Sequence, residues 1–224
     1  HIVEHDILGQ SGSKKIEIPG SNCVSNYMFR FRRSDANQRN EWTNFTNWAY
    51  ENIRPQPIIS TGGSLNGAIN TYNQSITGGV GNYPVNVKNV LLDLAIVLNG
   101  EYRENIMDSG VFLFCEKYSR TSGTFKDGLY HYSFALDTNR DNYQPSGCMN
   151  LTKYGNIVFE FNTLETPINP NASVDYLCGA DGELIGIRKN TSELHSYMFD
   201  FKVFEEKYNV ITIQNGMSYL MIQN

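Results

Sequence analysis

The sequence predicts an all-β fold of the sandwich or jelly-roll kind, and three observations lead to this prediction. Short segments in which polar and apolar residues alternate recur along the chain, which is the period of a half-buried strand. Turn signals such as Pro-Gly and Asn-Gly separate these segments. The 14 Tyr and 12 Phe residues also favour strands, because aromatic side chains suit a pleated surface. We expect about eight or nine strands and no solenoid or propeller.

The first half of the chain supplies three of the expected strands. Residues 14–18 and 26–33 alternate, and residues 90–98 form a strand-length apolar run. Residues 42–50 are expected to form a short helix or strand. Residues 55–84 are rich in Asn, Gly, Ser and Thr, which predicts a long polar surface loop.

The second half is more regular. The apolar run in 109–120 is too short to distinguish a buried strand from a short helix. Residues 128–136 alternate clearly, and residues 148–162 are expected to form a hairpin that turns at Tyr154-Gly155. A second long polar loop is expected at 163–193. The closing alternating segments are 198–204, 208–214 and 217–222.

The charge composition argues against a nucleic-acid-binding protein. The net charge is −5 and only 18% of the residues are charged, whereas phosphate binding needs clustered Lys and Arg. The one dense basic patch, at 30–33, alternates with a Phe and is interpreted as the end of a strand. No apolar run approaches the roughly 20 residues of a membrane helix.

The cysteines do not follow a metal-binding or disulfide pattern. The four of them lie far apart and without CxxC spacing, at Cys23, Cys115, Cys148 and Cys178. In a chain of this size they are expected to be small buried residues of a reducing compartment, with two disulfides as the alternative.

The sequence contains no arrangement that predicts catalysis, a cofactor or a bound metal. His1 and His5 fall in an N-terminal stretch that is expected to be mobile, and His131 and His195 are isolated. His131 lies in an alternating strand and is expected to be structural. HExxH, GxSxG and P-loop motifs are absent from the sequence, so no enzymatic activity is expected.

Two motifs carry a resemblance to a known family. The first lies after a Tyr-Ser-Phe strand and consists of Gln144, Pro145, Ser146 and Gly147, followed by Asn150 and Thr152. The second closes the chain and consists of Tyr208, Asn209, Val210 and Gly216. With these motifs in order, the chain resembles the C-terminal region of major capsid proteins of nucleocytoplasmic large DNA viruses.

The resemblance implies a fold, an assembly and a location. Residues 1–224 would form a single eight-stranded antiparallel jelly roll with long polar loops, the second of two in the parent protein. Three copies would form a homotrimer, a pseudo-hexagonal capsomer that contacts neighbouring capsomers and minor capsid proteins. These capsomers would tile an icosahedral shell, near an internal membrane but without spanning it. The protein would belong to the virion and be assembled in the host cytoplasm, with no cofactor and no nucleic acid bound.

Two other functions are compatible with a jelly roll. A carbohydrate- or ligand-binding module would use aromatic and Asn-rich loops, which this chain also has. A cupin-like enzyme would need His-rich metal motifs, which the sequence does not contain.

Overall fold

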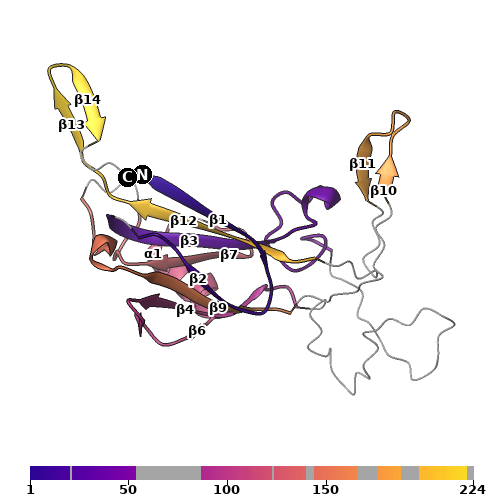
Figure 1. The fold of residues 1–224 in the computed structure, drawn as a ribbon, viewed down its shortest axis with the longest axis horizontal. Coiled ribbons are helices and arrows are strands. Elements are labelled where there is room, and N and C mark those ends of the chain that lie inside the picture. The colour runs from indigo at the N-terminus through magenta and orange to yellow at the C-terminus, as the bar shows by residue number, and fades with distance from the viewer. Residues whose placement is uncertain are drawn as a thin grey trace.

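A computed structural model of the chain describes residues 1–20, 22–53, 87–122, 124–139, 144–165, 176–187 and 197–220. Two antiparallel five-stranded sheets form the body of the protein (Figure 1). The first sheet has the order β1-β12-β3-β7, with β8 also paired to β3. Its strands are β1 (Ile2–Gln10), β12 (Phe199–Lys207), β3 (Cys23–Arg33), β7 (Leu129–Ser133) and β8 (Met149–Asn150).

The second sheet faces the first and has the order β2-β9-β4-β5, with β6 also paired to β4. Its strands are β2 (Ser13–Glu17), β9 (Ile157–Thr163), β4 (Leu91–Leu98), β5 (Glu101–Tyr102) and β6 (Met107–Asp108). Two separate hairpins complete the described strands: β10 (Tyr176–Cys178) with β11 (Leu184–Ile187), and β13 (Ile211–Gln214) with β14 (Met217–Leu220).

The core lies between the two sheets and is built mainly from aromatic rings. Every second residue of β12 points inward, as the alternation of 198–204 predicts, and Phe201 is fully buried. Its ring centroid lies 4.7 Å from that of Phe31 in the same sheet and 4.9 Å from that of Phe161 in the facing sheet. Tyr27 and Phe159 meet across the sheets in the same way, at 5.2 Å. Such edge and offset contacts stabilise a core beyond the area that they bury.

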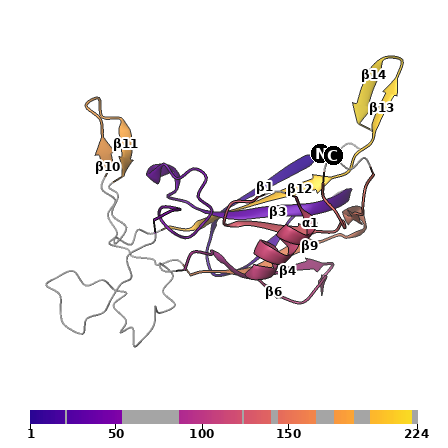
Figure 2. The ribbon, with the colours of Figure 1, turned by 180° about the vertical axis from the view of Figure 1, so that it is seen from behind.

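A short helical segment closes one side of the sandwich. It consists of a π-helical turn, η2 (Val111–Cys115), continued by α1 (Glu116–Arg120), and it contacts β7 of one sheet and β6 of the other (Figure 2). Phe112 anchors it, with its ring 5.8 Å from that of Phe29. The undecided run at 109–120 is therefore helical. No helix in the described ranges is long and apolar enough to cross a membrane.

Two clusters of charged side chains are buried. In the first, Asp35 accepts hydrogen bonds from Arg33, which ends β3, and from Arg39 in the 3-10 turn η1 (Asn37–Arg39). In the second, the Glu205 carboxylate lies 3.0 Å from the Lys207 ammonium and 3.3 Å from the His5 ring. Buried charges need such partners, because leaving water is costly for an unpaired ion.

His131 is buried in β7, as are its neighbours Tyr130 and Tyr132, so both faces of this strand are covered. Burial lowers the pKa of His131 to about 4, although the Glu116 backbone and the Glu206 charge act in the opposite direction. The imidazole is therefore neutral at pH 7.

The all-β jelly-roll class is confirmed, but the number of strands is larger than the expected eight. The described residues contain fourteen strands, of which ten lie in the two sheets. The strands that the sequence did not predict are β1, the two-residue strands β5 and β6, and the hairpin β10–β11.

The hairpin predicted at 148–162 is wrong. The strand β8 pairs with β3 of the first sheet, whereas β9 pairs with β2 and β4 of the second. A 3-10 turn, η3 (Leu151–Lys153), lies between them, and Leu151 is fully buried. The chain therefore crosses from the first sheet to the second at this turn, and the side chain of Leu151 packs into the core between them.

The N-terminal stretch is not a mobile segment as predicted but the nine-residue strand β1, which pairs along its length with β12. The short helix or strand expected at 42–50 is also wrong: in this part of the chain only an isolated bridge joins Tyr50 to Ile53. The loop predicted at 55–84 lies outside the described residues. In the loop predicted at 163–193, the described portion includes the unpredicted hairpin β10–β11.

Candidate functional site

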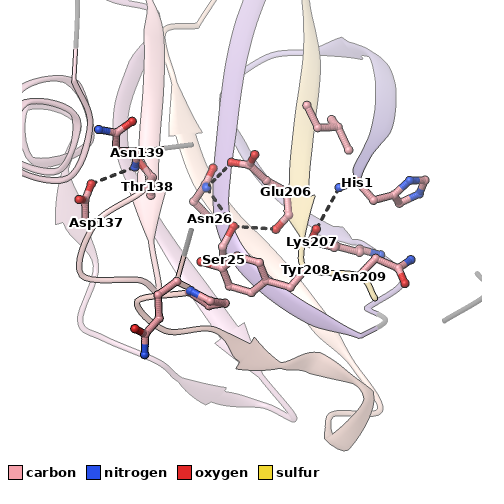
Figure 3. Close-up of a pocket in the computed structure, with 13 residues that line it drawn as sticks. His1, Ser25, Asn26, Asp137, Thr138, Asn139, Glu206, Lys207, Tyr208 and Asn209 are labelled. Atoms are coloured by element: carbon pink, nitrogen blue, oxygen red, sulfur yellow. Dashed lines mark hydrogen bonds between the residues drawn. The ribbon is translucent and has the colours of Figure 1, made fainter. Parts of the chain in front are cut away.

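An open cavity at one end of the sandwich brings the two sequence motifs together. Its volume is about 520 Å³, and it lies where β3 and β12 meet the segment that follows β7. Gln144 and Pro145 from the first motif line it, together with Tyr208 and Asn209 from the second. Figure 3 shows Tyr208 and Asn209 beside the end of β12, with Asp137, Thr138 and Asn139 on the other side of Asn26 and Glu206. The fold therefore joins two segments that are far apart in the sequence.

A β-bulge shapes one wall of the cavity. The register of β12 against β3 shifts between Glu206 and Lys207, which leaves Ser25 without an opposite residue. The Ser25 hydroxyl donates to the Glu206 carbonyl at 3.1 Å, and the Asn26 amide donates to the Glu206 carboxylate at 2.7 Å (Figure 3). These bonds hold the polar side chains of the wall in fixed positions.

The first motif forms the turn on the opposite side. The backbone N–H of Asp137 donates to the Ser146 hydroxyl at 2.9 Å, and that hydroxyl donates in turn to the Asp137 carbonyl. Gly147 follows with φ of +143°, a conformation that residues with a side chain rarely adopt. A Cβ there would also lie 3.3 Å from the Phe134 carbonyl oxygen. Ser146 and Gly147 thus have identifiable roles in shaping the turn.

Replacing Ser146 with alanine is expected to lower the free energy of unfolding by about 1 kcal/mol, because one side chain makes both turn hydrogen bonds. Urea unfolding followed by circular dichroism measures the change. Ser218→Ala, in the exposed hairpin β13–β14, is the matched control and should shift the free energy by less than about 0.5 kcal/mol. Equal effects of the two substitutions would contradict the structural role of Ser146.

Asn150 and Thr152 hold the segment after the turn in place by hydrogen bonds, and they do not line the cavity. The Asn150 side chain caps η3 by accepting a hydrogen bond from the Thr152 N–H at 3.1 Å. The Thr152 hydroxyl accepts from the Asn22 N–H at 3.0 Å, and the Leu151 N–H donates to the Asn22 carbonyl at 2.9 Å. These residues tie the crossing between the sheets to the start of β3.

The second motif leads from the cavity into the hairpin β13–β14. The Tyr208 N–H donates to the Cys23 carbonyl at 3.0 Å, and the Asn209 side chain accepts from the Val210 N–H at 2.8 Å. Gly216 lies in the hairpin turn with φ of +77°. Val210 and Gly216 therefore belong to the hairpin, and the structure does not bring them to the cavity.

Polar residues line much of the cavity, among them Asp137, Glu206, Lys207 and several residues with amide side chains. Within the described ranges, no group of three or more His, Cys, Asp or Glu residues is placed to hold a metal ion. Sequence reasoning did not identify the lining residues of β3 and β12, because their alternation resembles that of any other strand.

The hairpin β13–β14 presents an uncovered apolar surface. Ile211 and Ile213 lie on one face of β13 and are 65% and 73% exposed, and Leu220, opposite Ile211, is 45% exposed. Figure 1 shows the hairpin projecting away from the two sheets. The sequence has no charged residue after Lys207. A lone two-stranded hairpin is at best marginally stable in water, so this surface lacks the packing that would normally stabilise it.

The cysteines are not the buried residues that the sequence predicted. Cys115, Cys148 and Cys178 are exposed and Cys23 is half-buried, and all four are free thiols in the structure. They lie at strand ends and in the helical segment, where side chains face solvent.

A family of known proteins matches the chain. The family described as "Large eukaryotic DNA virus major capsid protein" matches residues 7–218, almost the whole chain. No curated protein matches the sequence.

Several solved structures share the fold. One is a quasi-atomic model of the PBCV-1 virus capsid, with 20% identity and a TM-score of 0.58, and another is PBCV-1 VP54 fitted into a reconstruction of the virophage Sputnik, with 20% identity and a TM-score of 0.57. Each match covers 100% of this chain and 50% of the other chain. The Faustovirus major capsid protein matches with 9% identity and a TM-score of 0.54, over 91% of this chain and 32% of its own. The chain thus spans about half the length of the PBCV-1 chains that it matches.

Proposed function

The chain belongs to the major capsid protein family of large eukaryotic DNA viruses, and from this premise we propose that it has a structural role in a virus shell. The family match over residues 7–218 is the observation that carries the proposal. The two packed sheets also support a structural role, because an aromatic core between two sheets makes a rigid building block. No enzymatic role is proposed, in line with a family whose members are structural.

In this proposal, residues 1–224 form one jelly-roll domain, the second of two in the parent protein. The match to half of each PBCV-1 chain supports this division. Three copies of the parent form a homotrimer with a pseudo-hexagonal outline, and these capsomers tile an icosahedral shell with minor capsid proteins between them. The shell lies near an internal membrane and is assembled in the host cytoplasm.

The motif residues have a place in the same proposal. Gln144, Pro145, Ser146 and Gly147 form the turn at the end of the sandwich, near Tyr208 and Asn209, and Asn150 caps η3 after it. Val210 and Gly216 set the direction and the turn of the hairpin. Together they determine the shape of one end of the building block.

The hairpin β13–β14 is proposed to contact a neighbouring copy of the protein. It projects from the body, carries no charge and exposes Ile211 and Ile213. Apolar residues on a marginal hairpin gain stability when another surface covers them, and a capsomer offers the surfaces of other copies for such a contact. A contact between two different patches can close into a ring, and closure after three copies would give a trimer.

The mass and shape of the complete protein that contains this chain test the proposal. Light scattering should give three times the monomer mass, and negative-stain images should show particles with a hexagonal outline. A monomer at all accessible concentrations, without hexagonal particles, would contradict the trimeric capsomer.

Placing charges on the apolar face of the hairpin is expected to weaken this assembly. Burying one isoleucine contributes about 1.5–3 kcal/mol, so Ile211→Lys with Ile213→Lys should lower the association constant at least roughly tenfold. Sedimentation of the complete protein over a range of concentrations measures the change.

The matched control is Thr212→Lys with Gln214→Lys, which adds the same charge to the opposite face of the same strand. It should weaken association much less. Thermal unfolding of the body should not change in either variant, because the hairpin lies outside the core cluster. Equal losses of association in both variants would exclude the apolar face as the contact.

A further inference from the structure

Two of the four free cysteines lie on the same face of the same pair of strands. In the antiparallel pair of β3 and β8, Val24 is opposite Met149 and Cys23 is opposite Asn150. Val24 is fully buried and Met149 packs against the core. Because side chains alternate along a strand, Cys23 and Cys148 both project from the other face of this pair, where Cys148 is the diagonal neighbour of Cys23.

The thiols of Cys23 and Cys148 also interact with each other. Burial raises the pKa of the Cys148 thiol, and a hydrogen-bonding interaction with Cys23 raises it further. Cys148 precedes β8 and directly follows Gly147, so ladder hydrogen bonds do not hold its backbone in place. Diagonal neighbours on a ladder lie slightly too far apart for a disulfide, so this freedom of the backbone at Cys148 is what allows the sulfur–sulfur bond to form.

Cys23 lies where the two motif segments converge. Its carbonyl accepts the hydrogen bond from the Tyr208 N–H, at the start of the second motif. Its thiol faces Cys148, which directly follows the Gln144–Gly147 turn. A covalent bond at this point would connect the turn on one side of the cavity to the strand that holds the other side.

We propose that Cys23 and Cys148 form an intramolecular disulfide when the protein meets an oxidant of the glutathione-disulfide class, and that the bond fastens the first-motif turn to β3. Cys148 is exposed and Cys23 is half-buried, so a small oxidant can reach the pair. The pairing does not depend on the assembly proposed above.

The reaction is two successive thiol–disulfide exchanges. A cysteine thiolate attacks one sulfur of glutathione disulfide, which forms a mixed disulfide and releases one glutathione thiolate. The second cysteine then attacks the protein sulfur of the mixed disulfide and releases the second glutathione. The two cysteines lose two protons and two electrons in total, and glutathione disulfide is reduced to two glutathione molecules. Because attack needs the thiolate, exchange at these thiols is faster in alkaline buffer than at neutral pH.

The test uses the full chain, equilibrated in buffers of increasing oxidised-to-reduced glutathione ratio at pH 8.5. The samples are quenched with acid, alkylated and digested without reduction, and the peptides are identified by mass spectrometry. A peptide pair that joins Cys23 to Cys148, with the loss of two hydrogens, is expected. Oxidation should also raise the thermal unfolding midpoint by roughly 5–15 °C.

Variants separate this pair from the other two cysteines. The Cys115→Ser, Cys178→Ser double variant should retain both the cross-linked peptide and the rise in midpoint. Cys23→Ser and Cys148→Ser should each abolish both. The proposal would be overturned if the double variant formed glutathione adducts without the cross-link. Cross-links through Cys115 or Cys178 in the unaltered chain, or a lower midpoint on oxidation, would overturn it as well.

Discussion

Replacing Phe201 with alanine is expected to lower the free energy of unfolding by about 3–5 kcal/mol. Phe201 is fully buried, and its ring lies 4.7 Å from that of Phe31 and 4.9 Å from that of Phe161. Removing it deletes buried apolar surface and leaves a cavity between the two sheets, which the surrounding rigid strands fill only in part. Chemical unfolding followed by tryptophan fluorescence and circular dichroism measures the loss.

Phe204→Ala is the matched control on the same strand. Phe204 lies on the outer face of β12, where it is only half-buried and contacts the Lys202 ammonium. Its loss should cost much less than that of Phe201. If both substitutions cost the same, the core would not lie between the sheets as described.

Replacing Asp35 with alanine is expected to cost about 3–5 kcal/mol, because two buried guanidinium groups would lose their counter-charge. Arg33 donates two hydrogen bonds to the Asp35 carboxylate, at 2.8 and 2.7 Å, and Arg39 donates a third at 2.9 Å. Asp127→Ala is the control, because Asp127 pairs with Lys88 at the surface and its carboxylate is 60% exposed. That change should cost at most about 1 kcal/mol.

The same carboxylate is expected to make stability depend on acid pH. Burial alone would raise the pKa of Asp35, but the charges and hydrogen bonds of Arg33 and Arg39 outweigh it and lower the pKa to about 2. Since the folded-state pKa lies below the unfolded value of about 3.9, this contribution is complete above pH 4 and is lost as the pH falls toward 2. It amounts to roughly 2 kcal/mol.

Urea unfolding at a series of pH values measures this dependence. In Asp35→Asn, the part of the decline between pH 4 and pH 2 that comes from Asp35 should disappear. An unchanged slope in that variant would show that other carboxylates cause the acid sensitivity.

Much of the fold could be predicted from local patterns. The alternation of 198–204 identifies β12 and its inward Phe residues, and Asn215-Gly216 identifies the turn between β13 and β14. These features depend only on residues that are neighbours in the sequence. The two-residue period of side chains along a strand and the residue preferences of turns are therefore enough to predict them. The two family motifs are local in the same sense.

The candidate site was predictable only in part. Gln144 and Tyr208 belong to recognisable motifs, but nothing in the sequence indicates that they line one cavity with Glu206 and Lys207. Likewise, β1 carries no turn signal and its residues are partly exposed, so its pairing with β12 could not be seen locally.

The sequence by itself determined the all-β class, most strand positions and the uncharged, apolar ending of the chain. Only the tertiary structure decided that β8 joins β3 rather than β9, that Phe112 draws 111–120 into a helical turn, and that Cys23 faces Cys148. The physical reason is the range of the interactions. Strand period and turn geometry depend on adjacent residues, whereas strand pairing depends on which distant surfaces bury the most apolar area together.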